Sequence, residues 1–245
     1  TSGAARVDFL EDYYDGISGE RADLLEAVRD QLAARSYRGS HLLERDIAAA
    51  FSGGLETNEA YDTARQQGVA LPTGFPATPL GAQLRAVAET INVRDKLFAS
   101  RQVFFIGLGG FDQARALPKL LSQIDGALAA FQAAMEALGL ARDVTLFTAS
   151  DFGRTLAVNG DGTDHGWGGH QVVLGGAVKG GEIYGALPPP TLGHEADSGG
   201  GRLIPSMAVD SYAAELGRWF GLSESERSAA LPGLSNFAPL PNSFI

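Results

Sequence analysis

The apolar positions of this chain follow a helical period in several segments. Residues 41–51 and 79–96 have apolar residues on one face, and residues 19–36 and 209–220 show the same spacing. The clearest segment is residues 118–138, where Leu121, Ile124 and Leu128 begin a series that ends at Leu138. Each of these segments therefore predicts an amphipathic helix.

Short apolar runs lie between the helical segments. Val103–Ile106 is a run of four apolar residues closed by glycines, and residues 144–149 and 171–175 are similar. Such runs are typical of strands that are buried on both faces of a parallel sheet. Alternation with helices then predicts an α/β sheet, while glycine and proline predict loops over residues 53–79 and 184–201.

The amino-acid composition excludes several classes of binding partner and of chemical site. The net charge is −10 and the pI about 4.8, and no cluster of basic residues is interleaved with aromatics. This balance argues against binding to nucleic acid. We expect no membrane span, because no window approaches the roughly 18 apolar residues that one requires. The absence of cysteine excludes disulfides, thiol nucleophiles and cysteine zinc sites.

The densest group of chemically active side chains lies in DFGRTLAVNGDGTDHGWGGH, residues 151–170. Asp151 follows one predicted strand, Asp112 follows another, and His165 precedes a third. In an open α/β sheet the carboxyl ends of the strands border the ligand crevice, so these three side chains predict a divalent-metal site. Arg154 is the candidate for binding a substrate anion, although it could instead pair with Asp151.

Each residue also has a plain structural interpretation. An aspartate after a strand, such as Asp112, commonly caps a helix or forms a turn. Asp161 and Asp164 lie in the turn-type sequence NGDGTD, and Trp167 can serve as a packing anchor. The pattern GLGGFD does not predict a dinucleotide site, because Asp112 takes the place of the third glycine.

Taken together, GLGGFD, VTLFTASDFGRT, NGDGTDHGWGGH and GRLIPSMAVDSYAAELGRWFG resemble a bacterial family of unknown function. Its members typically carry a twin-arginine export signal and are grouped with the alkaline phosphatase and sulfatase superfamily. The resemblance covers about residues 79–220. It implies a three-layer α/β/α sandwich with a mostly parallel sheet, alkaline-phosphatase-like, whose N-terminal part we expect to be absent or truncated.

The resemblance also implies a site and a location. Asp112, Asp151 and His165 match metal ligands of the superfamily, and the metal would be zinc, calcium or magnesium. The implied activity is hydrolysis of phosphate or sulfate esters, on a small or polymeric substrate, in the periplasm or outside the cell. We expect one α/β domain over residues 1–245, comprising a helical and loop portion (1–78), a sheet-forming core (79–221) and a tail (222–245).

Two departures from the family pattern support an alternative. The histidine that usually follows the first aspartate by two residues is Ala114 here, as if residues were deleted between Asp112 and Gln113. No serine or threonine can be assigned as the nucleophile. The alternative is a catalytically degenerate member that binds a ligand or an envelope protein partner without turnover.

Overall fold

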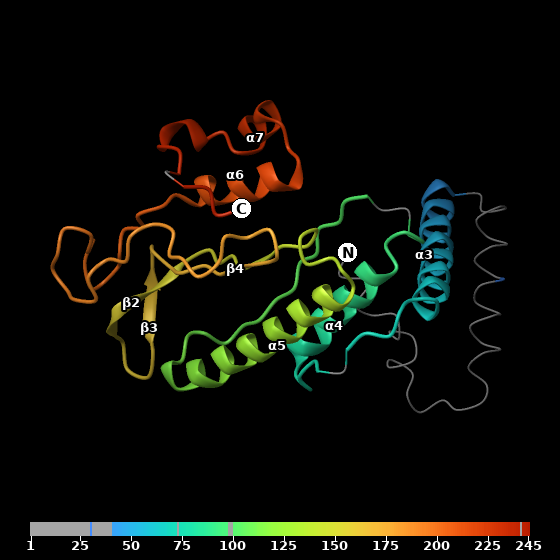
Figure 1. Cartoon of the computed structure of the whole chain (residues 1–245), viewed down its shortest axis with the longest axis horizontal. Coiled ribbons are helices and arrows are strands. Elements are labelled where there is room, and N and C mark those ends of the chain that lie inside the picture. Colours follow the sequence, from blue (N-terminus) through green and yellow to red (C-terminus); the bar gives the residue numbers. More distant parts are fainter. Residues whose placement is uncertain (1–29, 31–40, 73, 98–99, 241) are drawn as a thin grey trace. The chain divides into compact units, whose positions relative to one another are not determined.

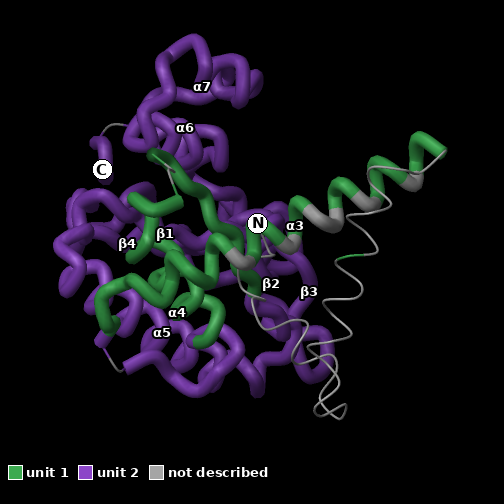
Figure 2. The backbone as a smooth tube through the Cα atoms, turned by 90° about the vertical axis from the view of Figure 1, so that its right-hand side faces the viewer, with its two compact units in different colours: residues 1–71, 82–107 green, residues 72–81, 108–245 purple. Residues whose placement is uncertain are grey.

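The computed structural model describes residue 30 and residues 41–245, except 73, 98, 99 and 241. Within it the chain divides into two compact units, residues 1–71 with 82–107 and residues 72–81 with 108–245 (Figure 2). The helix predicted over residues 19–36 lies outside the described residues apart from residue 30. Among the described helices, none combines the length and apolar character that a membrane crossing requires.

The first unit is helical in its described part. Helix α3 spans Leu42–Gln66, and α4 spans Pro79–Asn92 with its residues from 82 onward in this unit (Figure 1). Tyr61 of α3 and Thr90 of α4 share a buried hydrogen bond of 2.7 Å between their hydroxyl oxygens. Leu84 and Ala88 of α4 are fully buried at helical spacing. This spacing confirms the helical periodicity predicted for residues 79–96, although the helix ends four residues earlier.

Helix α3 corrects the predicted boundary of a loop. The sequence predicted a helix only to Phe51 and a loop from Gly53, whereas the helix continues to Gln66. Gly53 and Gly54 are exposed, and nothing lies within 4 Å of a Cβ added to either. Glycine lowers helix stability by only about 1 kcal/mol per residue. Burial of Tyr61 and Ala64, three positions apart, stabilises the helical conformation instead.

The predicted three-layer α/β/α sandwich with a mostly parallel sheet is wrong. The described residues form a mostly helical structure with two small antiparallel sheets. Strand β1 (Leu146–Phe147) pairs with β4 (Val173–Leu174), and β2 (Gly153–Val158) pairs with β3 (Thr163–Gly166). Within the described part of the chain, no strand has a parallel neighbour, so there is no sheet edge of the kind that the sequence predicted.

The run Val103–Ile106 explains much of this error. Its residues alternate between exposed and half-buried, as in a strand, but none of the described strands pairs with them. Val103 is 67 % exposed and Phe105 is 89 % exposed. The Gln83 side chain instead bonds the backbone of neighbouring Gly107, accepting from its N–H at 3.2 Å. An apolar run becomes buried only if other segments of the chain cover it, and no described strand covers this one.

The second unit holds the remaining helices. Helix α5 spans Leu117–Ala137 and α6 spans Val209–Phe220, which confirms both predicted helices. A 3-10 turn, η2 (Ala114–Ala116), precedes α5; a short helix, α7 (Glu224–Ala230), and a second 3-10 turn, η3 (Leu234–Asn236), follow α6.

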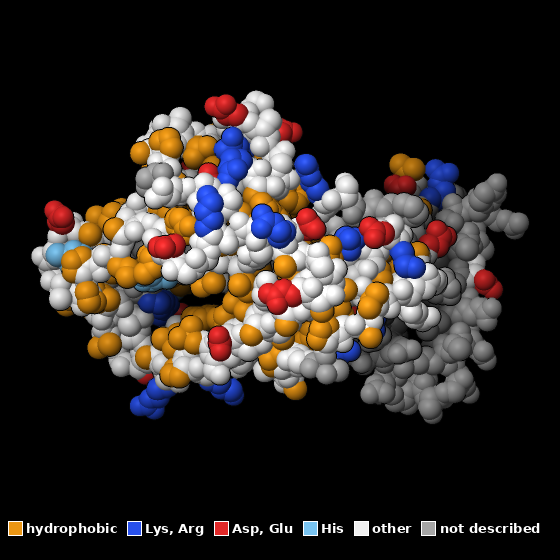
Figure 3. Space-filling view, in the orientation of Figure 1, with side chains coloured by type: hydrophobic (Ala, Val, Ile, Leu, Met, Phe, Trp, Pro, Cys, Tyr) orange, Lys and Arg blue, Asp and Glu red, His pale blue; other side chains and the backbone are white. Residues whose placement is uncertain are grey.

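The C-terminal segment of this unit lies against the rest of it. Phe244 is only 3 % exposed, and its ring contacts those of Tyr184 and Tyr212. Arg218 of α6 donates hydrogen bonds to the Ser243 hydroxyl and the Ile245 oxygen. Elsewhere the molecular surface shows hydrophobic side chains between charged ones (Figure 3).

Candidate functional site

The β2–β3 hairpin carries the side chains on which the sequence analysis concentrated. Its register places Arg154 of β2 directly opposite His165 of β3. Directly opposed residues of an antiparallel pair project from the same face of the sheet. Arg154 and His165 are therefore neighbours on one face, in a register that is shifted by an irregularity between Arg154 and Val158.

Glycines allow other backbone segments to approach this hairpin closely. A Cβ on Gly162 would overlap the carbonyl oxygen of Asp112, and one on Gly153 would overlap that of Gly168. The approach at Gly162 lets residue 113 form an isolated β-bridge with it. Gly162 thus admits the segment around Asp112, 50 residues earlier in the chain, against the hairpin.

Arg154 links the two segments through its guanidinium group. Its Nη1 donates to Asp112 Oδ1 at 2.6 Å, and its Nη2 donates to the Asp112 carbonyl at 3.3 Å. Its Nε donates to the Thr163 hydroxyl at 3.0 Å, and its Nη2 also bonds the Thr163 carbonyl. The Arg154 side chain is 21 % exposed, so these bonds are partly shielded from water. The arginine therefore fixes the hairpin and the Asp112 segment to each other.

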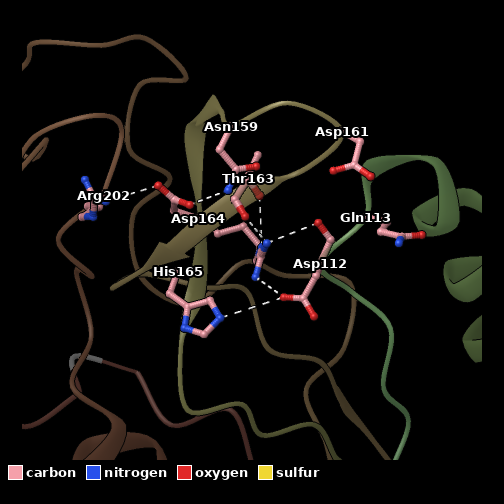
Figure 4. Close-up of a pocket in the computed structure, with 9 residues that line it drawn as sticks. Asp112, Gln113, Asn159, Asp161, Thr163, Asp164, His165 and Arg202 are labelled. Carbon is pink, nitrogen blue, oxygen red and sulfur yellow. Dashed lines mark hydrogen bonds and ion pairs between the residues drawn. The ribbon is translucent and has the colours of Figure 1, made fainter.

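These segments enclose a polar cleft of about 630 Å³, shown in Figure 4. Every lining residue carries a polar or charged side chain. The lining residues are Asp112, Gln113, Arg154, Asn159, Asp161, Thr163, Asp164, His165 and Arg202.

Asp112 and His165 meet at the accessible side of this cleft. The distance between Asp112 Oδ1 and His165 Nε2 is 3.9 Å, and the two side chains are 70 % and 65 % exposed. The imidazole stacks on the ring of Phe152, with centroids 3.7 Å apart and planes inclined by 13°. The sequence analysis did not select Phe152, although its position two residues before Arg154 in an extended segment was a usable signal.

The loop that carries Arg202 forms the remaining wall. The Asp197 carboxylate accepts backbone hydrogen bonds from Gly193, Gly199 and Gly201, and these N–H groups lower its pKa. Backbone bonds from Leu156 to Gly201 and from Ala157 to Gly200 tie this loop to β2. Arg202 then lies with Nη2 3.7 Å from Asp164 Oδ2. Sequence reasoning missed Arg202, because nothing local indicates that its loop returns to the hairpin.

The predicted metal ligands do not all line this cleft. Asp112 and His165 come together, whereas Asp151 is exposed and lies outside the lining. Within the described residues, no three histidine, aspartate or glutamate side chains are grouped so that they could hold a metal ion. Arg154, the predicted anion-binding residue, does line the cleft, but it pairs with Asp112. The metal site of zinc, calcium or magnesium stays a prediction.

Comparison with known proteins agrees with the resemblance seen in the sequence at the level of the family. No curated protein matches the chain, and no solved structure matches it. A family model described as protein of unknown function (DUF1501) matches residues 4–199, which include both the Asp112 segment and the β2–β3 hairpin. This match covers most of the chain, and the protein belongs to the DUF1501 family of proteins of unknown function.

Proposed function

We propose that the cleft between the β2–β3 hairpin and the Asp112 segment binds a polar small molecule. The observation that carries this proposal is a cleft lined only by residues with polar or charged side chains and held in place by the Arg154 hydrogen bonds. Side chains that are positioned before a ligand arrives lose less conformational entropy on binding. Ligand binding without turnover is also one branch of the alternative predicted from the sequence.

Metal-dependent ester hydrolysis, the activity implied by the resemblance, has less support from this geometry. Asp112 and His165 would be two ligands, but the described residues supply no third, and Arg154 already bonds the Asp112 oxygen that faces the imidazole. A catalytic zinc is usually held by three protein ligands. We therefore assign no catalytic step to a metal. The exported location implied by the resemblance remains a separate proposal.

Nuclear magnetic resonance of the histidine side chains tests the binding proposal. The chain has four histidines, and the ring signals of His165 can be followed during titration with sugars, polyamines, nucleosides and inorganic phosphate. We expect a saturable shift of the His165 signals with at least one of these compounds. The signals of His170 and His194, which do not line the cleft, are the internal control. If no compound in the panel moves the His165 signals, the proposal is wrong.

Elemental analysis of the purified protein, together with an aryl phosphate and aryl sulfate assay, tests the hydrolase. If the cleft only binds a ligand, we expect neither aryl ester to be hydrolysed. Stoichiometric divalent metal with turnover that Asp112→Asn abolishes would replace the binding proposal with catalysis.

A further inference from the structure

The cations of the cleft are already engaged by protein groups. Arg154 directs its N–H groups at Asp112 and Thr163. Arg202 donates to the Gly199 carbonyl at 3.1 Å and faces the Asp164 carboxylate. Three aspartates and two arginines line the cleft, so its own charges do not favour an anion. A phosphate or sulfate group would have to displace a carboxylate from each guanidinium.

Hydrogen-bonding groups that remain available are of both kinds. Within the described residues, the Asp161 carboxylate and the second oxygen of Asp112 have no hydrogen-bond partner, and both accept hydrogen bonds. The Gln113 amide offers a donor as well as an acceptor. A ligand that only donates, such as an ammonium ion, would match the carboxylates but leave the amide donor unpaired. A hydroxyl group can donate to one of these partners and accept from another.

An aromatic surface lies next to these groups. The Phe152 and His165 rings are stacked nearly parallel, so one face of each covers the other. Of the two rings only His165 lines the cleft, and because it is 65 % exposed its outer face remains open to a ligand, while Phe152 supports the opposite face. Flat aromatic faces of this kind attract the C–H groups of a saturated ring.

We infer that the ligand of the cleft is a cyclic polyol, a saccharide or a cyclitol. Its ring lies against the free face of the His165 imidazole, which Phe152 supports from behind, and its hydroxyl groups bond the Asp112 and Asp161 carboxylates and the Gln113 amide. This inference rests on the proposed binding function and adds the chemical class of the ligand. An organic cation is the competing class, because carboxylates beside an aromatic ring also suit an ammonium group.

Saturation-transfer NMR with defined probes separates these classes. The polyol probes are glucose, galactose, N-acetylglucosamine and myo-inositol, and the cationic probes are choline and spermidine. We expect saturation transfer to the ring C–H protons of at least one polyol, with a shift of the His165 signals. Phe152→Ala should weaken that binding roughly threefold to tenfold, the usual strength of one aromatic contact, because the His165 ring loses the stacking partner that holds it beside the ligand. Phe237→Ala is the matched control, because Phe237 is similarly exposed at 48 % and is not part of the Phe152–His165 stack.

Three results would overturn the inference, and they differ in what they leave standing. If choline or spermidine shifts the His165 signals and no polyol does, the binding function stands and the ligand class is wrong. If a polyol binds equally to wild type and to Phe152→Ala, the aromatic stack is not part of the site. If no probe affects His165, both the inference and the proposed function fail.

Discussion

Arg154 Nη1 lies 2.6 Å from Asp112 Oδ1, and this ion pair joins residues that are 42 positions apart in the chain. Its two members differ in exposure, since Arg154 is 21 % exposed and Asp112 is 70 % exposed. Arg154 also bonds Thr163 on the neighbouring strand, whereas the exposed carboxylate can turn to water. Removing the arginine therefore leaves more groups without partners than removing the charge of the aspartate does.

The first prediction concerns this asymmetry. Arg154→Met should lower the free energy of unfolding by about 1–3 kcal/mol, because the carbonyl groups of Asp112 and Thr163 lose a charged donor. Arg154→Lys should recover only part of this loss, since a single ammonium cannot reproduce a planar fork of donors. Asp112→Asn should cost less than about 1 kcal/mol, as is usual for exposed ion pairs. Urea denaturation of the three variants measures these differences. Equal losses for Arg154→Met and Asp112→Asn would contradict the linking role of the arginine.

The second prediction concerns the glycine that admits the Asp112 segment. Gly162→Ala should destabilise the protein by about 1–3 kcal/mol and abolish ligand shifts of the His165 signals, because the added methyl group overlaps the Asp112 carbonyl. Gly180→Ala is the control, since nothing lies within 4 Å of a Cβ at that position. Thermal denaturation and the His165 titration should both distinguish the two variants. If they behave alike, the close approach at Gly162 is not required for the cleft.

The third prediction tests the fold that the sequence did not reveal. Phe105→Ala should change the free energy of unfolding by less than about 0.5 kcal/mol, because the ring is 89 % exposed. Phe131→Ala, at a position that is 4 % exposed in α5, should cost about 3–5 kcal/mol. Chemical denaturation of both variants makes the comparison. A loss of several kcal/mol for Phe105→Ala would show instead that residues 103–106 form a buried strand.

The helices were predictable because their signal is local. The periodic apolar positions of residues 118–138 and 209–220 identify α5 and α6, and burial of Phe131 and Met135 in the structure agrees with that period. The strand predicted over Val103–Ile106 needed a partner from elsewhere in the chain, which local sequence does not specify. An apolar run indicates which residues could be buried, but not which segment of the chain would cover them. The parallel sheet was therefore inferred from a pattern that does not determine pairing.

The site was predictable in part for a similar reason. Asp112, Asp151 and His165 were expected to lie together; the structure brings Asp112 and His165 to 3.9 Å, whereas Asp151 lies outside the cleft. The sequence left two partners possible for Arg154, namely Asp151 and a bound anion. In the structure Arg154 pairs with Asp112 instead. That pairing depends on Gly162 and on the bridge to Gln113, which are contacts between distant segments. The residue types indicated which chemical groups could form a site. Contacts between distant backbone segments determined which of those residues lie together.

The last prediction concerns Tyr212 of α6, a residue outside the cleft. Burial raises the pKa of its phenol from 10.0 to about 12, and its hydroxyl donates to the Thr148 carbonyl at 3.2 Å. Since the folded state disfavours the phenolate, the folded protein holds its proton to a higher pH than the unfolded chain does. The stabilisation is therefore complete below pH 10 and is lost as the pH rises from 10 towards about 12.

Tyr212→Phe isolates this contribution from the other groups that titrate at high pH. The variant should be less stable than wild type by about 1 kcal/mol near neutral pH, because one hydrogen bond to a carbonyl is lost. Its stability should then fall less steeply than that of wild type above pH 10, so that the two curves converge. Urea denaturation of both proteins at a series of pH values measures the difference. Parallel curves would mean that the phenol titrates alike in the folded and unfolded states, and that burial in α6 does not perturb it.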